Sequence, residues 1–385
     1  MKNMFSQRFF NYSFVVFIIL YFYALNQSVK RLSKPVLRLN IPAKITPPYF
    51  PILVICKNRP EFFEKMLISL LKVRGVRHGD IIVVQDGNDM EVVDLVALHG
   101  LRHISKPEPS SMLNTKNGRL AHTFKYGINM AFDFFQNATG IIIVEDDLLF
   151  SPDFLEFFYK VYPIMKRNKK IYAASAWNDN GNAKVTRKLD AVKQTDFFPG
   201  LGWLCTRELW TKLGPNWPKE HWDWGIRNMK LGYVIHPEIP RDYHIGVKGT
   251  FMNKNLHNQF FKNVKYNQDT LFIWDDVSLD YMNDYDRYLI DKIRNADFAT
   301  SNTKLSIVNN DIVIVYGNDI QWKSIGRKLH IWHDSGRSMY KQIVDIWVGN
   351  HKLFLIKETS TLLKNNILDK YVVLNDKEIL KVISN

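Results

Sequence analysis

The sequence has little cysteine and none of the common nucleotide-binding fingerprints. Its only two cysteines in 385 residues, Cys56 and Cys205, are too few for a CxxC zinc site and argue against a disulfide-stapled scaffold. No GxGxxG pattern follows the first predicted strand, and no GxxxxGK[ST] pattern occurs. The chain also has no internal repeat. These absences exclude a dinucleotide fingerprint, a P-loop and a repeat architecture.

The basic residues are not gathered in one run. The formal net charge of +14 favours anionic partners such as phosphates, nucleotides or a membrane surface. Because the lysines and arginines are scattered along the chain, we expect no dedicated nucleic-acid face. Hydrophobic residues make up 46% of the chain and aromatic residues 14%, which is enough for a substantial core.

Residues 9–26 form the most hydrophobic stretch, apolar without a break from Phe14 to Leu25. A stretch of this length can span a bilayer core, and no A-x-A cleavage site follows it. The pattern predicts a cytosolic tail at 1–8, an uncleaved signal anchor at 9–26 and a basic, proline-containing stem at 27–49, with the rest of the chain lumenal. Basic residues flank the stretch on both sides, so the positive-inside rule does not by itself decide the orientation. A buried N-terminal helix is the alternative to an anchor.

Strand and helix patterns alternate up to about residue 175. The predicted strands are apolar runs at 52–56, 80–86, 101–107 and 140–147. The predicted helices cover 61–75, 91–100, 120–137 and 152–168, and Pro152 is expected at the start of the last one. Strands that are continuously apolar are typical of a parallel sheet covered on both faces, so the first half predicts an α/β fold.

The pattern changes after residue 175, where tryptophan and glycine become frequent. Residues 311–329 predict a strand followed by a helix. Residues 340–357 predict a β-hairpin that turns at Gly349–Asn350. Residues 360–385 predict a tail of mixed strand or helix character.

Polar side chains stand at the carboxyl ends of three predicted strands: Arg59, Asp86 and the run Glu145, Asp146 and Asp147. In α/β sheets, ligands bind at this edge. Three adjacent carboxylates repel one another, and a hard cation such as Mg²⁺ or Mn²⁺ accepts oxygen ligands while bridging to phosphate. The run therefore predicts a metal and nucleotide site, with a solvated acidic loop as the alternative.

Asp223 lies between Trp222 and Trp224 in the stretch EHWDWGIRN. A carboxylate among indole rings is partly desolvated, which favours a general base. The alternative is that Asp223 caps a helix that starts near Trp224.

Five segments together resemble the N-acetylglucosaminyltransferase I family. They are VEDDLLFSPDFLEFF, SAWNDNG, TDFFPGLGWL, ELWTKLGPNWPKEHWD and HPEIPRDYHIGVKG, and the likeness runs in order from about Pro51 to Lys357. The resemblance implies a GT-A type α/β fold, in which a Rossmann-like nucleotide half with a mixed sheet joins an acceptor half. It implies transfer of GlcNAc from UDP-GlcNAc in β-1,2 linkage to mannose on a glycoprotein, with inversion, Mn²⁺ as the metal and residence in the Golgi membrane as a type II protein.

On this resemblance, a catalytic domain covers 50–357. Its predicted parts are a nucleotide-binding half at 50–175, an acceptor and catalytic half at 176–300 and a C-terminal strand, helix and hairpin part at 301–357. Residues 358–385 are a C-terminal extension. From Trp203 to Trp224 the chain is rich in tryptophan, and we expect about half of these rings to stack on sugar.

The resemblance also implies roles for individual residues. Asp147 corresponds to the metal ligand and Asp223 to the catalytic base. The remaining residues correspond to the donor site: Arg59, Asp86 as the reader of uracil, Glu145 and Asp146 at the donor sugar and ribose, Lys125 and Thr250. His244 to Gly249 resembles the start of a loop that closes over the nucleotide.

Departures from the family concern the acceptor and one donor position. Lys125 stands where the family has a histidine, the family pattern WDDW is WDWG here, and Thr250 and Phe251 replace smaller or hydroxyl residues. Transfer to O-linked mannose on protein, or to another acceptor glycan, therefore remains open. A non-catalytic sugar-binding relative is a further alternative, against which the presence of Asp147 and Asp223 argues.

Overall fold

The computed structural model describes residues 47–107, 115–275, 277–366 and 371–384, and its described residues from Pro48 onward belong to one compact unit. The predicted cytosolic tail and anchor, and nearly all of the predicted stem, lie outside the described residues. None of the helices within the described ranges is long and apolar enough to cross a membrane.

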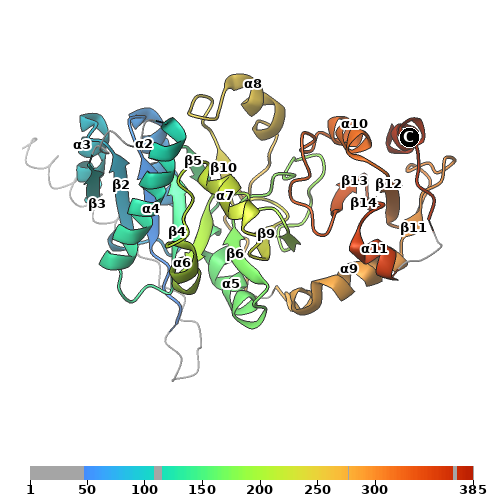
Figure 1. Cartoon of the computed structure of the whole chain (residues 1–385), viewed down its shortest axis with the longest axis horizontal. Coiled ribbons are helices and arrows are strands. Elements are labelled where there is room, and N and C mark those ends of the chain that lie inside the picture. The colour runs from blue at the N-terminus through green and yellow to red at the C-terminus, as the bar shows by residue number, and fades with distance from the viewer. Residues whose placement is uncertain (1–46, 108–114, 276, 367–370, 385) are drawn as a thin grey trace, which may run out of the picture. The chain divides into compact units, whose positions relative to one another are not determined.

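An eight-stranded mixed sheet organises most of this unit, with the strand order β3-β2-β1-β4-β8-β6-β9-β7 (Figure 1). Its strands are β1 (Ile52–Cys56), β2 (Ile81–Asp86), β3 (Arg102–Lys106), β4 (Gly140–Glu145), β6 (Ile171–Ser175), β7 (Val192–Thr195), β8 (Trp203–Thr206) and β9 (Tyr233–Pro237). The first four strands are mutually parallel, as their continuous apolar runs predicted. β8 is antiparallel to both β4 and β6, which makes the sheet mixed.

Helices cover both faces of the parallel strands. They are α2 (Pro60–Leu70), α3 (Met90–Leu98), α4 (Lys116–Phe134) and α5 (Phe154–Arg167). β1 shows why its run is continuous: Ile52 and Val54 join the core beneath α2 and α5, whereas Leu53 and Ile55 join the core beneath α4. Each β1 residue is therefore buried whichever way it points, as the two-faced sheet requires.

The helix predicted to begin at Pro152 begins two residues later, at Phe154. Asp153 precedes it but makes no capping bond, because its carboxylate accepts hydrogen bonds from Arg241, Asn267 and Trp274 instead. Asp153 and Arg241 are both buried, and their ion pair of 2.6 Å ties the start of α5 to the chain that follows β9.

Smaller elements connect the main sheet to the rest of the unit. They are the antiparallel pair β5 (Leu148–Phe150) and β10 (Asp242–His244), with α6 (Arg207–Leu213), α7 (Trp222–Asn228), α8 (Lys254–Leu256) and α9 (Tyr285–Arg294). Short 3-10 turns at His78–Asp80 and Asp280–Asp284 and a π-helical turn at His257–Phe261 complete this part.

A second, four-stranded sheet with the order β11-β12-β14-β13 has its own core. Its strands are β11 (Asp297–Phe298), β12 (Ile312–Tyr316), β13 (Ile343–Val348) and β14 (His351–Lys357), and its helices are α10 (Asp319–Leu329), α11 (Thr361–Asn366) and α12 (Asp376–Ser384). The predicted hairpin that turns at Gly349–Asn350 is confirmed as β13 and β14. The described parts of the C-terminal tail are mainly helical.

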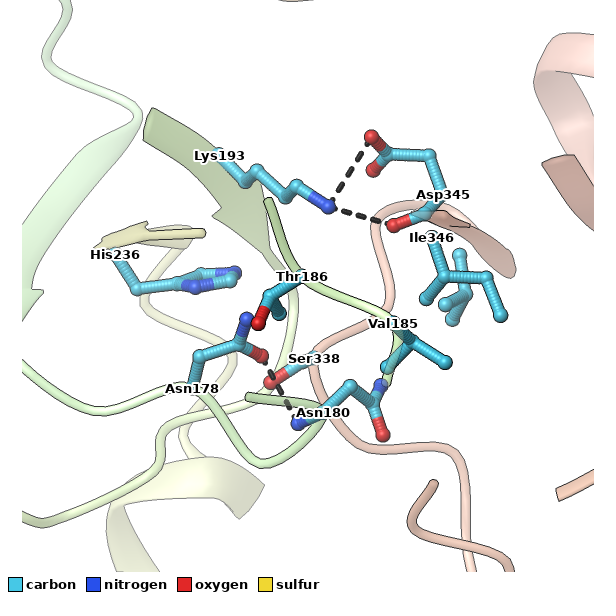
Figure 2. A pocket seen from close by; sticks show the side chains of 10 residues that line it. Asn178, Asn180, Val185, Thr186, Lys193, His236, Ser338, Asp345 and Ile346 are labelled. Carbon is cyan, nitrogen blue, oxygen red and sulfur yellow. Dashed lines mark hydrogen bonds and ion pairs between the residues drawn. The ribbon is translucent and has the colours of Figure 1, made fainter. Parts of the chain in front are cut away.

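Buried charges join this second sheet to the main one. Lys193 of β7 donates 2.6 Å to the backbone oxygen of Asp345 on β13 and lies 3.1 Å from its carboxylate. Figure 2 shows both side chains beside a small polar cavity lined also by Asn178, Thr186 and His236. The cavity has room for about one water molecule. Its small size and central position indicate a structural joint rather than a substrate site.

Candidate active site

The acidic run lies at the end of β4, beside the end of β1. Asp146 and Asp147 are 2% and 4% exposed. The Arg59 guanidinium, which follows β1, pairs with both: Nη1 lies 2.7 Å from Asp147 Oδ2, and Nε donates 3.3 Å to Asp146 Oδ2. The adjacency of β1 and β4 in the sheet thus brings together residues that are 87 and 88 positions apart.

This cluster is short of positive charge. Burial, together with repulsion by Asp147 and Asp146, raises the pKa of Glu145 to about 8. Burial and the charge of Asp147 raise the pKa of Asp146 to about 6, even though Arg59 acts in the opposite direction. Burial alone would lower the pKa of Arg59, but the charges of Asp147 and Asp146 raise it. One guanidinium does not neutralise three carboxylates, so the site favours a further cation.

The segment from His244 to Gly249 lies against this cluster. β10 pairs with β5, and the Ile245 backbone N–H donates 2.9 Å to the Asp147 backbone oxygen. A Cβ on Gly246 would collide with Asp147 Oδ2, so only glycine fits there. Arg59 Nη1 also donates 3.2 Å to the Lys248 backbone oxygen. Thr250, just beyond this segment, is exposed.

His244 adds an imidazole to the same place, which the sequence reading did not single out. Its Nε2 lies 3.5 Å from Asp147 Oδ2, and burial lowers its pKa, so the ring is neutral at pH 7. Its Nδ1 is buried without a hydrogen-bond partner.

A metal ion would have few protein ligands here. In the described part of the chain, no group of three or more His, Cys, Asp or Glu side chains is arranged to hold a metal. Mn²⁺ and Mg²⁺, however, often bind through one or two carboxylates and take their other ligands from waters and substrate phosphates. The oxygen donor of Asp147 and the excess of negative charge fit an ion shared with a nucleotide. They do not fit an all-protein cage.

A second polar group surrounds Asp86 at the end of β2. Lys106, the last residue of β3, donates 2.7 Å to Asp86 Oδ1, and Arg119 of α4 donates 2.7 Å to Oδ2. Lys57 lies 3.3 Å from Oδ2. Burial opposes ionisation of Asp86, but the bonds from Arg119 and Lys106 leave its pKa below the usual value. Sequence reasoning missed these three cations, although Lys106 and Lys57 also stand at strand ends.

Lys125 was predicted to lie at the donor site. It is half-buried on α4, six residues after Arg119. Burial lowers the pKa of His122, and the charges of Lys106 and Lys125 lower it further. Arg119 of α4 therefore faces Asp86, and Lys125 lies near enough to His122 on the same helix for its charge to act on that ring.

Asp223 lies in the first turn of α7 and does not cap it. The N-cap position is held by His221 with φ of 44°, and α7 begins at Trp222. The capping interpretation of Asp223 is therefore wrong. Its carboxylate is 31% exposed and lies 3.0 Å from Arg227 Nη2. The Asp223 charge also contributes to the raised pKa of Glu145, so Asp223 lies within electrostatic range of the acidic run.

The tryptophans around Asp223 are mostly structural. Trp217 and Trp203 both stack on Trp222, with ring centroids 5.7 and 6.1 Å apart, and Phe124 of α4 stacks on it at 4.2 Å. Trp203, Trp217 and Trp222 are buried, Trp210 is half-buried and only Trp224 is exposed. The expectation that about half of these rings face a ligand is too high, because stacking against α4 places them in the core.

Two other carboxylates near the candidate base are poor substitutes for it. Asp242 is wholly buried behind Gly202, and burial raises its pKa well above the usual value. Both of its carboxylate oxygens are buried without a hydrogen-bond partner, as is expected of a protonated acid shut away from substrate. Glu220 is exposed and accepts a hydrogen bond from Thr115.

Comparison with solved structures gives low similarity. The mannosyltransferase PcManGT from Pyrobaculum calidifontis, solved with GDP-Man and Mn²⁺, is 17% identical at a TM-score of 0.33, over 58% of this chain and 65% of that one. S. aureus TarS, solved with UDP-GlcNAc, is 11% identical at a TM-score of 0.35, over 52% of this chain and 60% of that one. At such TM-scores these likenesses say nothing about function.

Comparison with known sequences gives a stronger similarity. The alpha-1,3-mannosyl-glycoprotein 2-beta-N-acetylglucosaminyltransferase of Arabidopsis thaliana is 27% identical over 337 residues, which cover 82% of this chain and 75% of that protein. The model of the GNT-I family matches residues 24–367. Together with the mixed α/β sheet, this match confirms the predicted resemblance and its GT-A type fold. The chain belongs to the GNT-I family.

Proposed function

We propose that this protein transfers GlcNAc from UDP-GlcNAc in β-1,2 linkage to a mannose of an N-glycan, with inversion at the anomeric carbon. Family membership and the name of the Arabidopsis relative support the reaction class. The observation that carries the proposal is Asp223, a partly exposed carboxylate held 3.0 Å from Arg227 and near enough to the acidic run for its charge to contribute to the raised pKa of Glu145.

The nucleotide belongs at the Asp86 group. Asp86 Oδ1 accepts one hydrogen bond from Lys106, and a carboxylate oxygen has room for a second donor, such as the imide N–H of uracil. Lys57, Lys106 and Arg119 give this place a net positive charge that suits a nucleoside diphosphate. Lys125 would add a fixed positive charge on the same side.

The diphosphate and donor sugar belong at the acidic run. Arg59 would move from its carboxylate partners to phosphate oxygens, and Glu145 and Asp146 would accept hydrogen bonds from sugar and ribose hydroxyls. Asp147 would hold Mn²⁺, which when bound would stabilise the negative charge of the leaving diphosphate. Thr250, which is exposed just after the segment from His244 to Gly249, would contact the donor.

Asp223 would act as the general base. It would accept the proton of the acceptor hydroxyl as that oxygen forms a bond to the anomeric carbon. The bond between this carbon and the diphosphate oxygen would break at the same time, and its electron pair would leave with UDP. Arg227 holds the Asp223 carboxylate at 3.0 Å, which would keep it oriented toward the acceptor.

The acceptor could be distinguished directly. The purified chain from about Pro48 would be incubated with UDP-GlcNAc and Mn²⁺, together with either a mannose-terminated N-glycan or an O-mannosyl peptide. Transfer to the N-glycan with a β-1,2 linkage, read by mass spectrometry and NMR, is the expected result. Transfer to the O-mannosyl peptide alone would assign the protein to the sister activity. No transfer to either would refute the proposal.

We also propose that residues 9–26 anchor the protein in the Golgi membrane, with the catalytic domain in the lumen. Asn137, the exposed asparagine of an Asn-Ala-Thr sequon between α4 and β4, would then be accessible for glycosylation. In sealed microsomes, we expect protease to spare the catalytic domain. Digestion of that domain with protection of the N-terminus would reverse the orientation.

A further inference from the structure

Trp224 is the one exposed tryptophan of the chain. All ten tryptophans lie within the described residues, and of these only Trp224, at 57% exposure, is open to solvent. It stands on α7 directly after Asp223. An indole exposed beside a candidate catalytic carboxylate offers an apolar ring face and a polar N–H to any ligand that binds there.

The Trp224 indole and the Asp223 carboxylate both lie next to the Arg227 guanidinium. The Arg227 guanidinium lies 3.0 Å from Asp223 Oδ2 and 5.5 Å from the centroid of the Trp224 ring. The same guanidinium lies 4.1 Å from the centroid of Phe197, and Arg227 Nε donates 2.8 Å to the Phe198 backbone oxygen. Arg227 is thus held in place and keeps the Trp224 ring close to the carboxylate.

A second exposed aromatic ring reaches the same end of α7 from a different element. Phe251 is 54% exposed and follows the segment that contacts Arg59 and Asp147. Its ring centroid lies 6.0 Å from that of His221, the residue that precedes α7. Trp224 within α7 and Phe251 beside its N-cap residue therefore lie at the same end of α7 and come from two separate parts of the chain.

We propose that Trp224 and Phe251 form a platform on which the acceptor sugar ring stacks, and that they determine which acceptor is used. This inference rests on the proposed function. A base must lie about 3 Å from the hydroxyl that it deprotonates, so the acceptor ring must lie beside Asp223. The C–H face of a pyranose is apolar and matches an exposed aromatic face. Trp224, directly after Asp223 in α7, and Phe251, beside the N-cap residue of α7, both offer such a face.

The test is kinetic and uses a free oligosaccharide. In Trp224→Ala and Phe251→Ala, the KM for a mannose-terminated oligosaccharide should rise roughly tenfold, while kcat stays within about twofold and UDP affinity is unchanged. Trp224→Phe should restore most of the affinity. Phe134→Ala is the matched control, because Phe134 is similarly exposed (48%) but lies on α4 in contact with Arg102.

Three results would overturn the platform. An unchanged KM in both alanine variants would exclude it. A rise in KM for a glycopeptide without any change for the free oligosaccharide would mean that the rings contact peptide instead. If the wild type transfers no GlcNAc, the proposed function fails on its own, and saturation-transfer NMR with the oligosaccharide still tests the platform. Equal or absent binding in wild type and Trp224→Ala would then refute it.

Discussion

Two strand ends at the same edge of the sheet carry carboxylates, yet their charge balance is opposite. Asp86 at the end of β2 has three cationic neighbours, Lys57, Lys106 and Arg119. The run of three carboxylates lies at the end of β4. Among the described residues, Arg59 is the only permanently charged cation that pairs with it. The excess positive charge at the end of β2 would attract an anionic ligand, and the excess negative charge at the end of β4 would attract a cation. A metal–nucleotide diphosphate would satisfy both.

The largest effect should come from removing a carboxylate from the acidic run at the end of β4. Asp147→Ala removes the proposed metal ligand, so we expect transfer to fall by on the order of 10³-fold or more and Mn²⁺-dependent UDP binding to disappear. Calorimetry of UDP binding with and without Mn²⁺ measures this directly. Asp133→Ala, which changes an exposed acid on α4, serves as the control. Full activity of Asp147→Ala in EDTA would remove the metal from the proposal.

The second-largest effect should come from Asp223, whose substitution separates the chemical step from donor binding at the two strand ends. Asp223→Asn should lower kcat by about 10²-fold or more, because general-base catalysis typically contributes ~10²–10⁴-fold. UDP-GlcNAc affinity in Mn²⁺ should be nearly unchanged, since the proposed nucleotide contacts lie at Asp86 and Arg59. Single-turnover kinetics with a parallel binding assay measures both quantities. Turnover within a few-fold of wild type would place the base elsewhere, and Glu220→Gln would then be the next variant to measure.

The third prediction compares how substitutions at the two strand ends change the free energy of unfolding. Asp86→Asn removes a carboxylate that three cations surround, so the free energy of unfolding should fall by about 2 kcal/mol. Glu145→Gln replaces a carboxyl group that must take up a proton to be buried at pH 7, because its pKa is raised to about 8. The neutral amide should raise the free energy of unfolding by about 1 kcal/mol without metal, a small value because Glu145 keeps partial exposure. Urea unfolding at pH 7 gives both values. Changes of the same sign would contradict the opposite charge balance.

The smallest effect sharpens the role of the Asp86 group. Lys106→Met removes a buried cation from Asp86 while two others remain, so UDP affinity should fall about tenfold, which is ~1.4 kcal/mol. If Asp86 reads the base, the preference for UDP over CDP should also narrow. Lys57→Met is the matched control, because its side chain is 48% exposed and its effect should be smaller. An unchanged UDP affinity in Lys106→Met would show that Lys106 has only a structural role.

Local pattern was sufficient for the elements that position these groups. The apolar runs from Ile52 and Ile141 predicted buried strands, because continuous hydrophobicity over such lengths suits a sheet covered on both sides. The polar residues after each run then had to lie at one edge, since parallel strands end together. The placement of Asp86, Arg59 and the acidic run at that edge followed from the sequence for this reason.

Local pattern was not sufficient for the partners of these groups or for the tryptophans. Lys106 reaches Asp86 across 20 positions, and Arg59 reaches Asp147 across 88, so neither pair appears in any local window. Trp222 and Trp224 are near neighbours in sequence, yet one is in the core and the other in solvent, because only Trp222 faces Phe124 of α4. The sequence by itself determined where the main strands and helices lie along the chain and which polar residues follow each strand. Only the tertiary structure decided which charges are paired and which aromatic ring is left exposed beside Asp223, because both depend on packing between distant segments.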